Sequence, residues 1–251
     1  MFKKVALPLN TSAMGMGIDV MPTGSRLPIT FDYLRAFCYW YKVFDIDASV
    51  VFVDKEQKFK TYYWGNMSKK NLGNSCLCSG DCRDKDGSEY CDFKISELKE
   101  NGFKYAIYTL NGFGEDLNKG EIYCGLQNKQ NLNTKAFDPK NIEFKIHRKG
   151  DTRGYVGFAV DFDTNEIVML NQMLANGTEV VNPKVFFSIK QYLNTSFLDN
   201  FNMYKLLSYM GEVVGDINDA DIVFDSSRDN DIKDKEVITP FDIEKLVTLL
   251  K

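Results

Sequence analysis

The chain has 251 residues, of which 44% are hydrophobic and 14% aromatic, so it can bury a sizeable core in one large domain or two smaller ones. Its formal net charge of -4 at pH 7 gives no basic field that would hold a phosphate backbone, which excludes nucleic acid as the expected partner. Pro8 and Asn10 interrupt the apolar start too early for a signal peptide. No apolar run reaches the roughly 20 residues of a membrane-spanning helix. We therefore expect a cytoplasmic protein, or one assembled from the cytoplasm into a larger particle.

Residues 1–24 show no sustained hydrophobic period. Turn-forming residues are frequent there, in Met14-Gly15-Met16-Gly17 and in Pro22-Thr23-Gly24. This pattern predicts an extended N-terminal arm.

Residues 25–176 are dominated by short β-type segments separated by turn residues, a pattern that predicts a β-sandwich. The segments with the strongest strand pattern are 49–53, 59–64, 103–110 and 142–146. Val156, Phe158, Val160 and Phe162 then alternate with other residues, and the turn residues 163–165 lead into the apolar run 167–170. This last pair of segments predicts a β-hairpin.

After residue 176 the hydrophobic period becomes helical. One apolar face follows Pro183, a second runs from Met203 to Met210 and stops at Gly211, and Thr239-Pro240-Phe241-Asp242 has the residues of a helix start. We expect residues 177–251 to form a small helical extension packed on the sandwich. The acid-rich stretch 216–236 contains a strand-like segment at 222–224 and does not fit the EF-hand spacing, so a solvated loop is favoured over a second metal site.

Four of the six cysteines lie between residues 76 and 91. Their spacing, Cys76-x-Cys78-x3-Cys82 with Cys91 beyond, lacks the CxxC pair of common zinc modules, and Cys76 and Cys78 share one face of a strand. Reduced structural thiols are therefore favoured over a zinc site.

Five acidic side chains predict a calcium site at one rim of the sandwich. Asp45 and Asp47 stand two residues apart at the head of a predicted strand, so they point the same way, and Asp81, Asp86 and Glu89 belong to a glycine-containing loop. Ca²⁺ takes six to eight oxygen ligands, and loops at one end of a sandwich can bring such ligands together. The alternative is that these aspartates only cap turns and face solvent.

The same residues carry a family resemblance. The segments 44–49 (Phe-Asp-Ile-Asp-Ala-Ser), 79–81 (Ser-Gly-Asp), 87–92 (Gly-Ser-Glu-Tyr-Cys-Asp) and 104–110 resemble, in order and spacing, the tellurite-resistance TerD family. This is a family of calcium-binding β-sandwich proteins of bacterial stress-response systems. The likeness is greatest to the TerD domain at the C-terminus of large bacterial cytoplasmic proteins, and it extends over about residues 24 to 250 through Gly24-Ser25-Arg26, 35–40, Asp161-Phe162-Asp163 and 238–243.

This resemblance implies a mainly β fold, namely a TerD-like β-sandwich followed by a small C-terminal helical segment. It also implies a non-enzymatic calcium-binding protein of a stress-response or scaffold type, with protein partners. The chain departs from the family pattern at Cys82, where asparagine is usual, and at Asp86-Gly87-Ser88-Glu89, where Gly-Asp-Asp-Glu is usual. One carboxylate of the usual cluster is therefore missing.

Catalysis has little support in the sequence. The single histidine, His147, falls on the polar face of a predicted strand, and the glycines lack the spacing of phosphate-binding loops. We therefore expect that the protein is not an enzyme. Two alternatives to the stress-response function stay open: a structural component of a larger assembly, such as a virus particle, that self-associates through the arm, and a calcium-dependent membrane binder that uses Trp64, Met67, Lys69 and Lys70.

Overall fold

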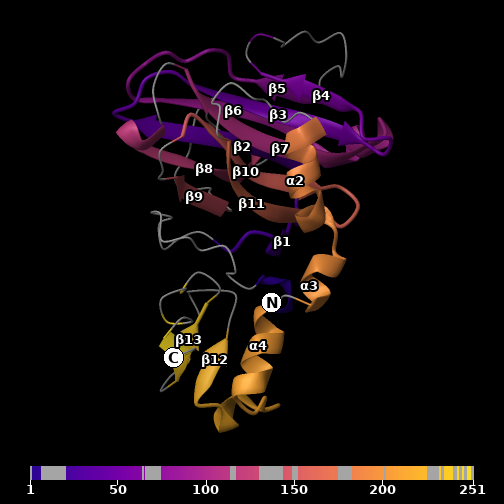
Figure 1. The fold of residues 1–251 in the computed structure, drawn as a ribbon, viewed down its shortest axis with the longest axis vertical. Coiled ribbons are helices and arrows are strands. Elements are labelled where there is room, and N and C mark those ends of the chain that lie inside the picture. Colours follow the sequence, from indigo (N-terminus) through magenta and orange to yellow (C-terminus); the bar gives the residue numbers. More distant parts are fainter. Residues whose placement is uncertain are drawn as a thin grey trace.

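The computed structural model describes residues 2–6, 21–63, 65, 75–113, 117–129, 144–148, 152–174, 183–200, 202–224, 232, 235–239, 242, 245 and 248–249. Figure 1 shows a β-sandwich at one end of an elongated molecule and the helix of residues 203–210 at the other. The mainly β class and the C-terminal helices predicted from the sequence are confirmed. Most of the predicted N-terminal arm and the loop with Trp64, Met67, Lys69 and Lys70 lie outside the described residues.

Two antiparallel sheets form the sandwich. The six-stranded sheet has the order β1 (Arg26–Pro28), β11 (Glu166–Leu174), β10 (Gly154–Asp161), β7 (Phe103–Gly112), β3 (Ile46–Asp54) and β4 (Phe59–Tyr62). The five-stranded sheet has the order β5 (Cys76–Cys78), β6 (Gly87–Lys94), β2 (Tyr33–Tyr41), β8 (Glu121–Asn128) and β9 (Phe144–Arg148). A short helix α1 (Ile95–Glu100) and a 3-10 turn η3 (Leu117–Lys119) connect strands.

The main core fills the space between the two sheets. Alternate residues of each strand point into it, as the period-two pattern predicts. Phe52 of β3 contacts Phe93 of β6 edge-on, with ring centroids 5.7 Å apart, and Trp40 of β2 is fully buried. Each such side chain contributes about 1.5–3 kcal/mol of transfer free energy, so the core holds the two sheets face to face.

A second apolar cluster covers the outer face of the six-stranded sheet. Helix α2 (Pro183–Leu193) lies across this face in two views and packs Val185, Phe186 and Ile189 against residues of β3, β10 and β11. Strand β10 is therefore buried on both sides along its whole length.

The predicted hairpin is present as β10 and β11, with Asp161 paired to Glu166 and Asn165 in the left-handed region (φ 52°). The simple alternation predicted for β10 is wrong at one point. The register shifts between Val156 and Phe158, so that Val156 packs under α2 while Phe158 faces the core between the sheets. A bulge at Gly157 is the physical reason, because an extra residue in a strand turns the following side chains to the opposite face.

The rest of the C-terminal part extends beyond β1. Helices α3 (Ser196–Asn200) and α4 (Met203–Met210) lead to a 3-10 turn η5 (Ile217–Asp219) and to β12 (Ile222–Phe224), which pairs in parallel with β13 (Glu236–Ile238). The predicted helix start at Thr239 has a capping interaction, because the Thr239 N–H and hydroxyl both donate to the Asp242 carboxylate.

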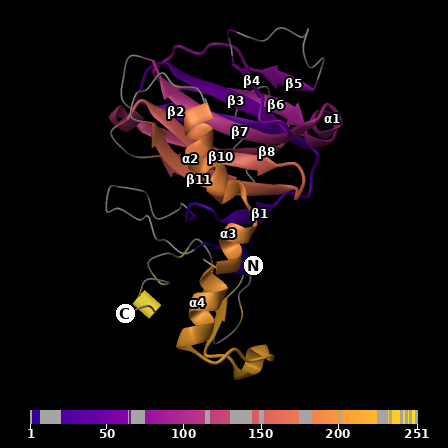
Figure 2. The same ribbon diagram turned by 45° about the vertical axis from the view of Figure 1, so that its right-hand side comes forward.

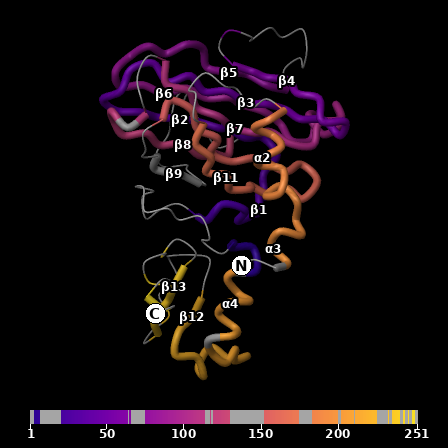
Figure 3. The backbone as a smooth tube through the Cα atoms, viewed as in Figure 1, coloured from indigo at the N-terminus to yellow at the C-terminus, as the bar shows by residue number. Residues whose placement is uncertain are grey.

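The first residues of the chain join this C-terminal part to the sandwich. A 3-10 turn, η1 (Phe2–Lys4), lies between β1 and α4 in the tube of Figure 3. The Met203 N–H donates to the Val5 carbonyl at 2.7 Å, and the buried Ala6 N–H donates to the Ser25 hydroxyl at 2.9 Å. None of the helices in the described part of the chain has the length and apolar character to cross a lipid bilayer.

Candidate metal centre

Asp45 and Asp47 are positioned by the start of strand β3. Asp47 lies within the strand and pairs with Asn111 of β7, whereas Asp45 immediately precedes it with φ at 57°. Aspartate tolerates this left-handed conformation better than most residues. The Phe113 N–H donates to the Asp45 carbonyl at 2.9 Å, so the β3–β7 pairing holds both aspartates in place.

Asp81 reaches the same place from the loop between β5 and β6. Gly80, with φ at 105°, permits the bend that precedes Asp81. The loop is closed by a hydrogen bond from the Ser79 N–H to the Tyr90 carbonyl, at 2.9 Å, and farther along the Trp40 indole N–H donates to the Asp84 carbonyl, at 2.9 Å. The loop belongs to the five-stranded sheet, so the site spans the two sheets at one rim.

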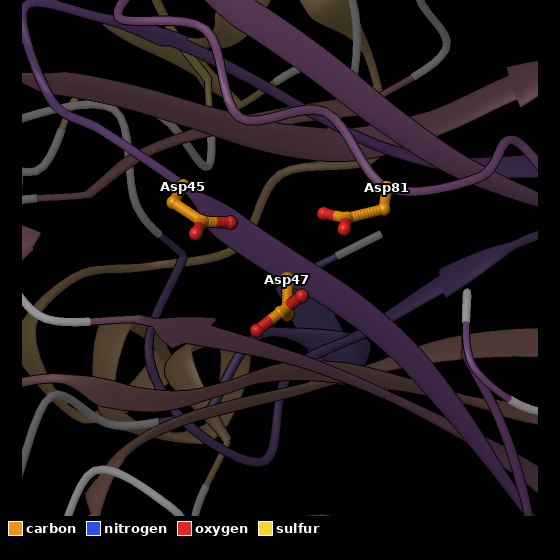
Figure 4. A group of neighbouring side chains, drawn as sticks. All are labelled: Asp45, Asp47 and Asp81. Atoms are coloured by element: carbon orange, nitrogen blue, oxygen red, sulfur yellow. The ribbon is translucent and has the colours of Figure 1, made fainter.

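The three aspartates form one acidic group. One carboxylate oxygen from each of Asp45, Asp47 and Asp81 lies within 4.8 Å of the others. Figure 4 shows the carboxylates of Asp45 and Asp81 pointing toward each other, with that of Asp47 beside them on β3. Partial burial raises the pKa of Asp45, and the negative charge of Asp81 raises it further, while Arg83 opposes the shift.

Arg83 already provides a positive charge at this group. Its guanidinium pairs with one Asp81 carboxylate oxygen, at 2.7 Å from the terminal nitrogen and 2.8 Å from Nε. The Arg83 side chain is 71% exposed, so it can leave without uncovering buried surface. A cation that binds here therefore competes with an exposed guanidinium for Asp81.

Glu89 is a buried neighbour of the acidic group. Its side chain is buried, and its two carboxylate oxygens accept the Ala48 N–H at 2.8 Å and the Cys82 N–H at 3.0 Å. Burial raises the pKa of Glu89 to about 8, and Asp47 and Asp81 add to that shift against the two N–H donors. Glu89 thus connects strand β3 to the loop that carries Asp81.

Asp86 is also separate from the acidic group. Its exposed carboxylate accepts the Lys42 N–H at 2.8 Å, and Lys42 has φ at 62°. Asp86 therefore stabilises the turn that leads from β2 toward β3. Of the five predicted ligands, the structure brings together Asp45, Asp47 and Asp81 and gives Asp86 and Glu89 other partners.

The donor set of the group fits a hard cation. The three side chains offer carboxylate oxygens and no nitrogen or sulfur, which is the chemistry that Ca²⁺ and Mg²⁺ prefer over transition metals. Ca²⁺ suits the group better, because it accepts irregular arrangements on loops, whereas Mg²⁺ demands a near-octahedral shell. Asp45, Asp47 and Asp81 would hold the ion, and backbone carbonyls or water would complete its six to eight ligands.

In the described part of the chain, the acid-rich stretch 216–236 adds no residue to this group. Asp216 of the acid-rich stretch accepts the Asn218 N–H at 2.8 Å and caps a 3-10 turn, whereas Asp225, Asp229, Asp231 and Asp234 lie outside the described residues. The sequence interpretation missed Arg83 as the partner of Asp81. The signal for it was the proximity of opposite charges two residues apart in one loop, which is common on protein surfaces and therefore unspecific.

Comparisons with known proteins leave the site without a named relative. The chain matches no protein-family model and no curated protein. The resemblance to the TerD family therefore stays a prediction from its motifs.

Proposed function

We propose that this chain is a non-enzymatic calcium-binding protein of the TerD-like type, acting in a stress response or as a scaffold. The observation that carries the proposal is the meeting of Asp45 and Asp47 with Asp81, which come from different sheets and from distant parts of the chain. Like charges this close repel one another, and a divalent cation relieves that repulsion better than the exposed Arg83 guanidinium does. Bound Ca²⁺ would also tie the β5–β6 loop to β3.

Calorimetric titration of the chelator-treated full chain with Ca²⁺ tests this proposal. We expect saturable binding, and we expect Asp47→Asn and Asp81→Asn each to weaken it at least tenfold, because each removes a charged ligand. Asp54→Asn is the matched control. Asp54 stands at the other end of the same strand, where its carboxylate accepts the Lys58 N–H at 2.8 Å.

Asp86→Asn distinguishes the observed three-carboxylate group from the five-ligand site predicted from the sequence. We expect its calcium isotherm to match that of the wild type, since the Asp86 carboxylate is engaged by the Lys42 N–H. Isotherms that are the same for the wild type, Asp47→Asn and Asp81→Asn would remove the acidic group as the site.

A structural role in a larger assembly is the second candidate. It is favoured by apolar side chains that face solvent in the distal C-terminal part, where Tyr209 is 78% exposed and Val213 is 60% exposed. Exposed apolar groups of this kind are typical of surfaces that meet a protein partner. Light scattering in chelator and in calcium measures self-association and separates the two functions. Self-association that is the same with and without calcium, and that is lost in Tyr209→Ser, would favour the assembly role.

A further inference from the structure

Cys78 and Cys91 stand directly opposite each other on the paired strands β5 and β6. The Ser79 N–H donates to the Tyr90 carbonyl on one side of this pair, and the Lys94 N–H donates to the Ser75 carbonyl farther along. Because hydrogen-bonded and non-hydrogen-bonded pairs alternate in an antiparallel ladder, Cys78 and Cys91 form a non-hydrogen-bonded pair. The Cα atoms of such a pair are about 4.5 Å apart, within the range of about 4.4–6.8 Å that a disulfide spans.

The two sulfur atoms point toward each other. Their separation is 2.6 Å, and both thiols are free. A zinc ion bound at about 2.3 Å to each of two sulfurs in a tetrahedral site needs them about 3.8 Å apart, so the spacing leaves no room for a shared metal ion. The geometry is that of two thiols placed to form a bond.

Cys78 is the thiol better suited to react first. It is 8% exposed and lies on the three-residue edge strand β5, whereas Cys91 is fully buried on β6. Short edge strands open more readily than central ones, so a small reagent reaches Cys78 before Cys91. Hydrogen bonds from the thiols of Cys76 and Cys91 to the Cys78 sulfur lower its pKa, and the thiolate is the form that attacks.

We propose that Cys78 and Cys91 are a reversible dithiol–disulfide site that a low-molecular-weight disulfide such as oxidised glutathione oxidises. The Cys78 thiolate attacks one sulfur of the small disulfide and forms a mixed disulfide, and the first small thiolate leaves and takes up a proton. The Cys91 thiol, on losing its proton, attacks the Cys78 sulfur and expels the second small thiolate. Two protein thiols are thereby oxidised to one disulfide, and one small disulfide is reduced to two thiols.

This site goes beyond calcium binding and does not depend on it. The bond would close the segment from Cys78 to Cys91, which contains both Asp81 and Glu89, into a covalent loop. Oxidation would therefore hold the edge strand β5 in place and limit the motion of the loop between the strands.

Equilibration of the chelator-treated full chain with mixtures of reduced and oxidised glutathione tests the proposal. Acid quenching, alkylation and peptide mapping should show one intramolecular disulfide between Cys78 and Cys91, which excess reduced glutathione reverses. Cys78→Ser and Cys91→Ser should each abolish it. Cys82→Ser is the matched control, since Cys82 is partly exposed in the same loop and should be dispensable for the bond.

Two results would overturn the proposal. One is wild-type protein in which both thiols remain open to alkylation when the glutathione is almost wholly oxidised. The other is a cross-link that joins different cysteines.

Discussion

Glu89 shows how one carboxylate can organise a site that it does not itself line. It occupies a buried position between strand β3 and the β5–β6 loop and accepts one backbone N–H from each. Two such bonds fix the loop against the strand, so that Asp81 meets Asp45 and Asp47. Burial without a cationic partner among its described contacts leaves Glu89 harder to ionise than an exposed glutamate, which has a consequence for stability.

Without metal, the free energy of unfolding should fall as the pH rises from about 4.5 to about 8. The pKa of Glu89 is raised from 4.5 to about 8 in the folded protein, so in this window the folded state holds a proton that the unfolded state has released. Each pKa unit corresponds to about 1.4 kcal/mol, so the loss is on the order of a few kcal/mol. Urea denaturation in chelator at several pH values measures it.

Glu89→Gln should remove this pH dependence, because glutamine does not ionise. Glu56→Gln, at an exposed turn, serves as the control that retains it. If the wild type and Glu89→Gln lose stability in parallel as the pH rises, another group is responsible.

At the scale of elements, the Asn202 side chain makes hydrogen bonds to both helix α3 and helix α4. The Asn202 side-chain oxygen Oδ1 accepts the Lys205 N–H at 2.8 Å, and the side-chain amide Nδ2 donates to the Leu198 carbonyl at 2.6 Å. Asn202 thus caps the start of α4 and also satisfies a carbonyl at the end of α3.

Asn202→Ala should lower the local stability of α4 by about 1–2 kcal/mol, because both hydrogen bonds are lost. Hydrogen–deuterium exchange of residues 203–210 measures this, with the exchange of β7 as the internal reference. Asn202→Asp keeps the acceptor and should have a smaller effect. Equal exchange in the two variants would mean that the cap contributes nothing.

Elements with a strong local period could be predicted closely from the sequence. The predicted face behind Pro183 and the one from Met203 to Met210 coincide with α2 and α4, and the strand-like segment 222–224 coincides with β12. The bulge at Gly157 and the parallel partner of β12 could not be predicted, because both depend on which distant strand lies alongside.

The candidate site could be predicted only in part, because some of its contacts are local in the sequence and others depend on the finished fold. Asp45 and Asp47 share a strand start, and the loop with Asp81 follows a short edge strand, so their proximity follows from a sandwich with converging loops. The partners of Asp86 and Glu89 are backbone N–H groups that the finished fold leaves open. No local pattern in the sequence shows where such groups lie.

At the scale of the whole molecule, Arg26 joins three parts of the chain. Its guanidinium is 1% exposed and contacts Asp161 at 3.2 Å and Glu166 at 3.0 Å, at the two ends of the β10–β11 hairpin turn. It also donates to the Leu193 carbonyl at the end of α2, at 2.6 Å. The start of the sandwich, its central hairpin and the covering helix therefore share one buried charge.

Arg26→Met should destabilise the protein by about 3–5 kcal/mol, because two largely buried carboxylates lose their shared cation. Urea denaturation measures the change. The triple variant with Asp161→Asn and Glu166→Gln should recover part of the loss, since no uncompensated charge remains. A loss below about 1 kcal/mol for Arg26→Met would show that Lys4, which pairs with Glu166 at 2.9 Å, is sufficient.

The isolated β-bridge between Ala6 and Asn202 joins the segment before the sandwich to the start of α4. During synthesis Val5 and Ala6 leave the ribosome almost 200 residues before Asn202 and Met203, their partners at the start of α4. Val5 is fully buried in the folded protein, and its carbonyl accepts the Met203 N–H of α4. Until α4 has been made, this hydrogen bond cannot form. A nascent chain halted before residue 202 would therefore lack the contact of this segment with α4, while the Ala6 N–H could still donate to the Ser25 hydroxyl.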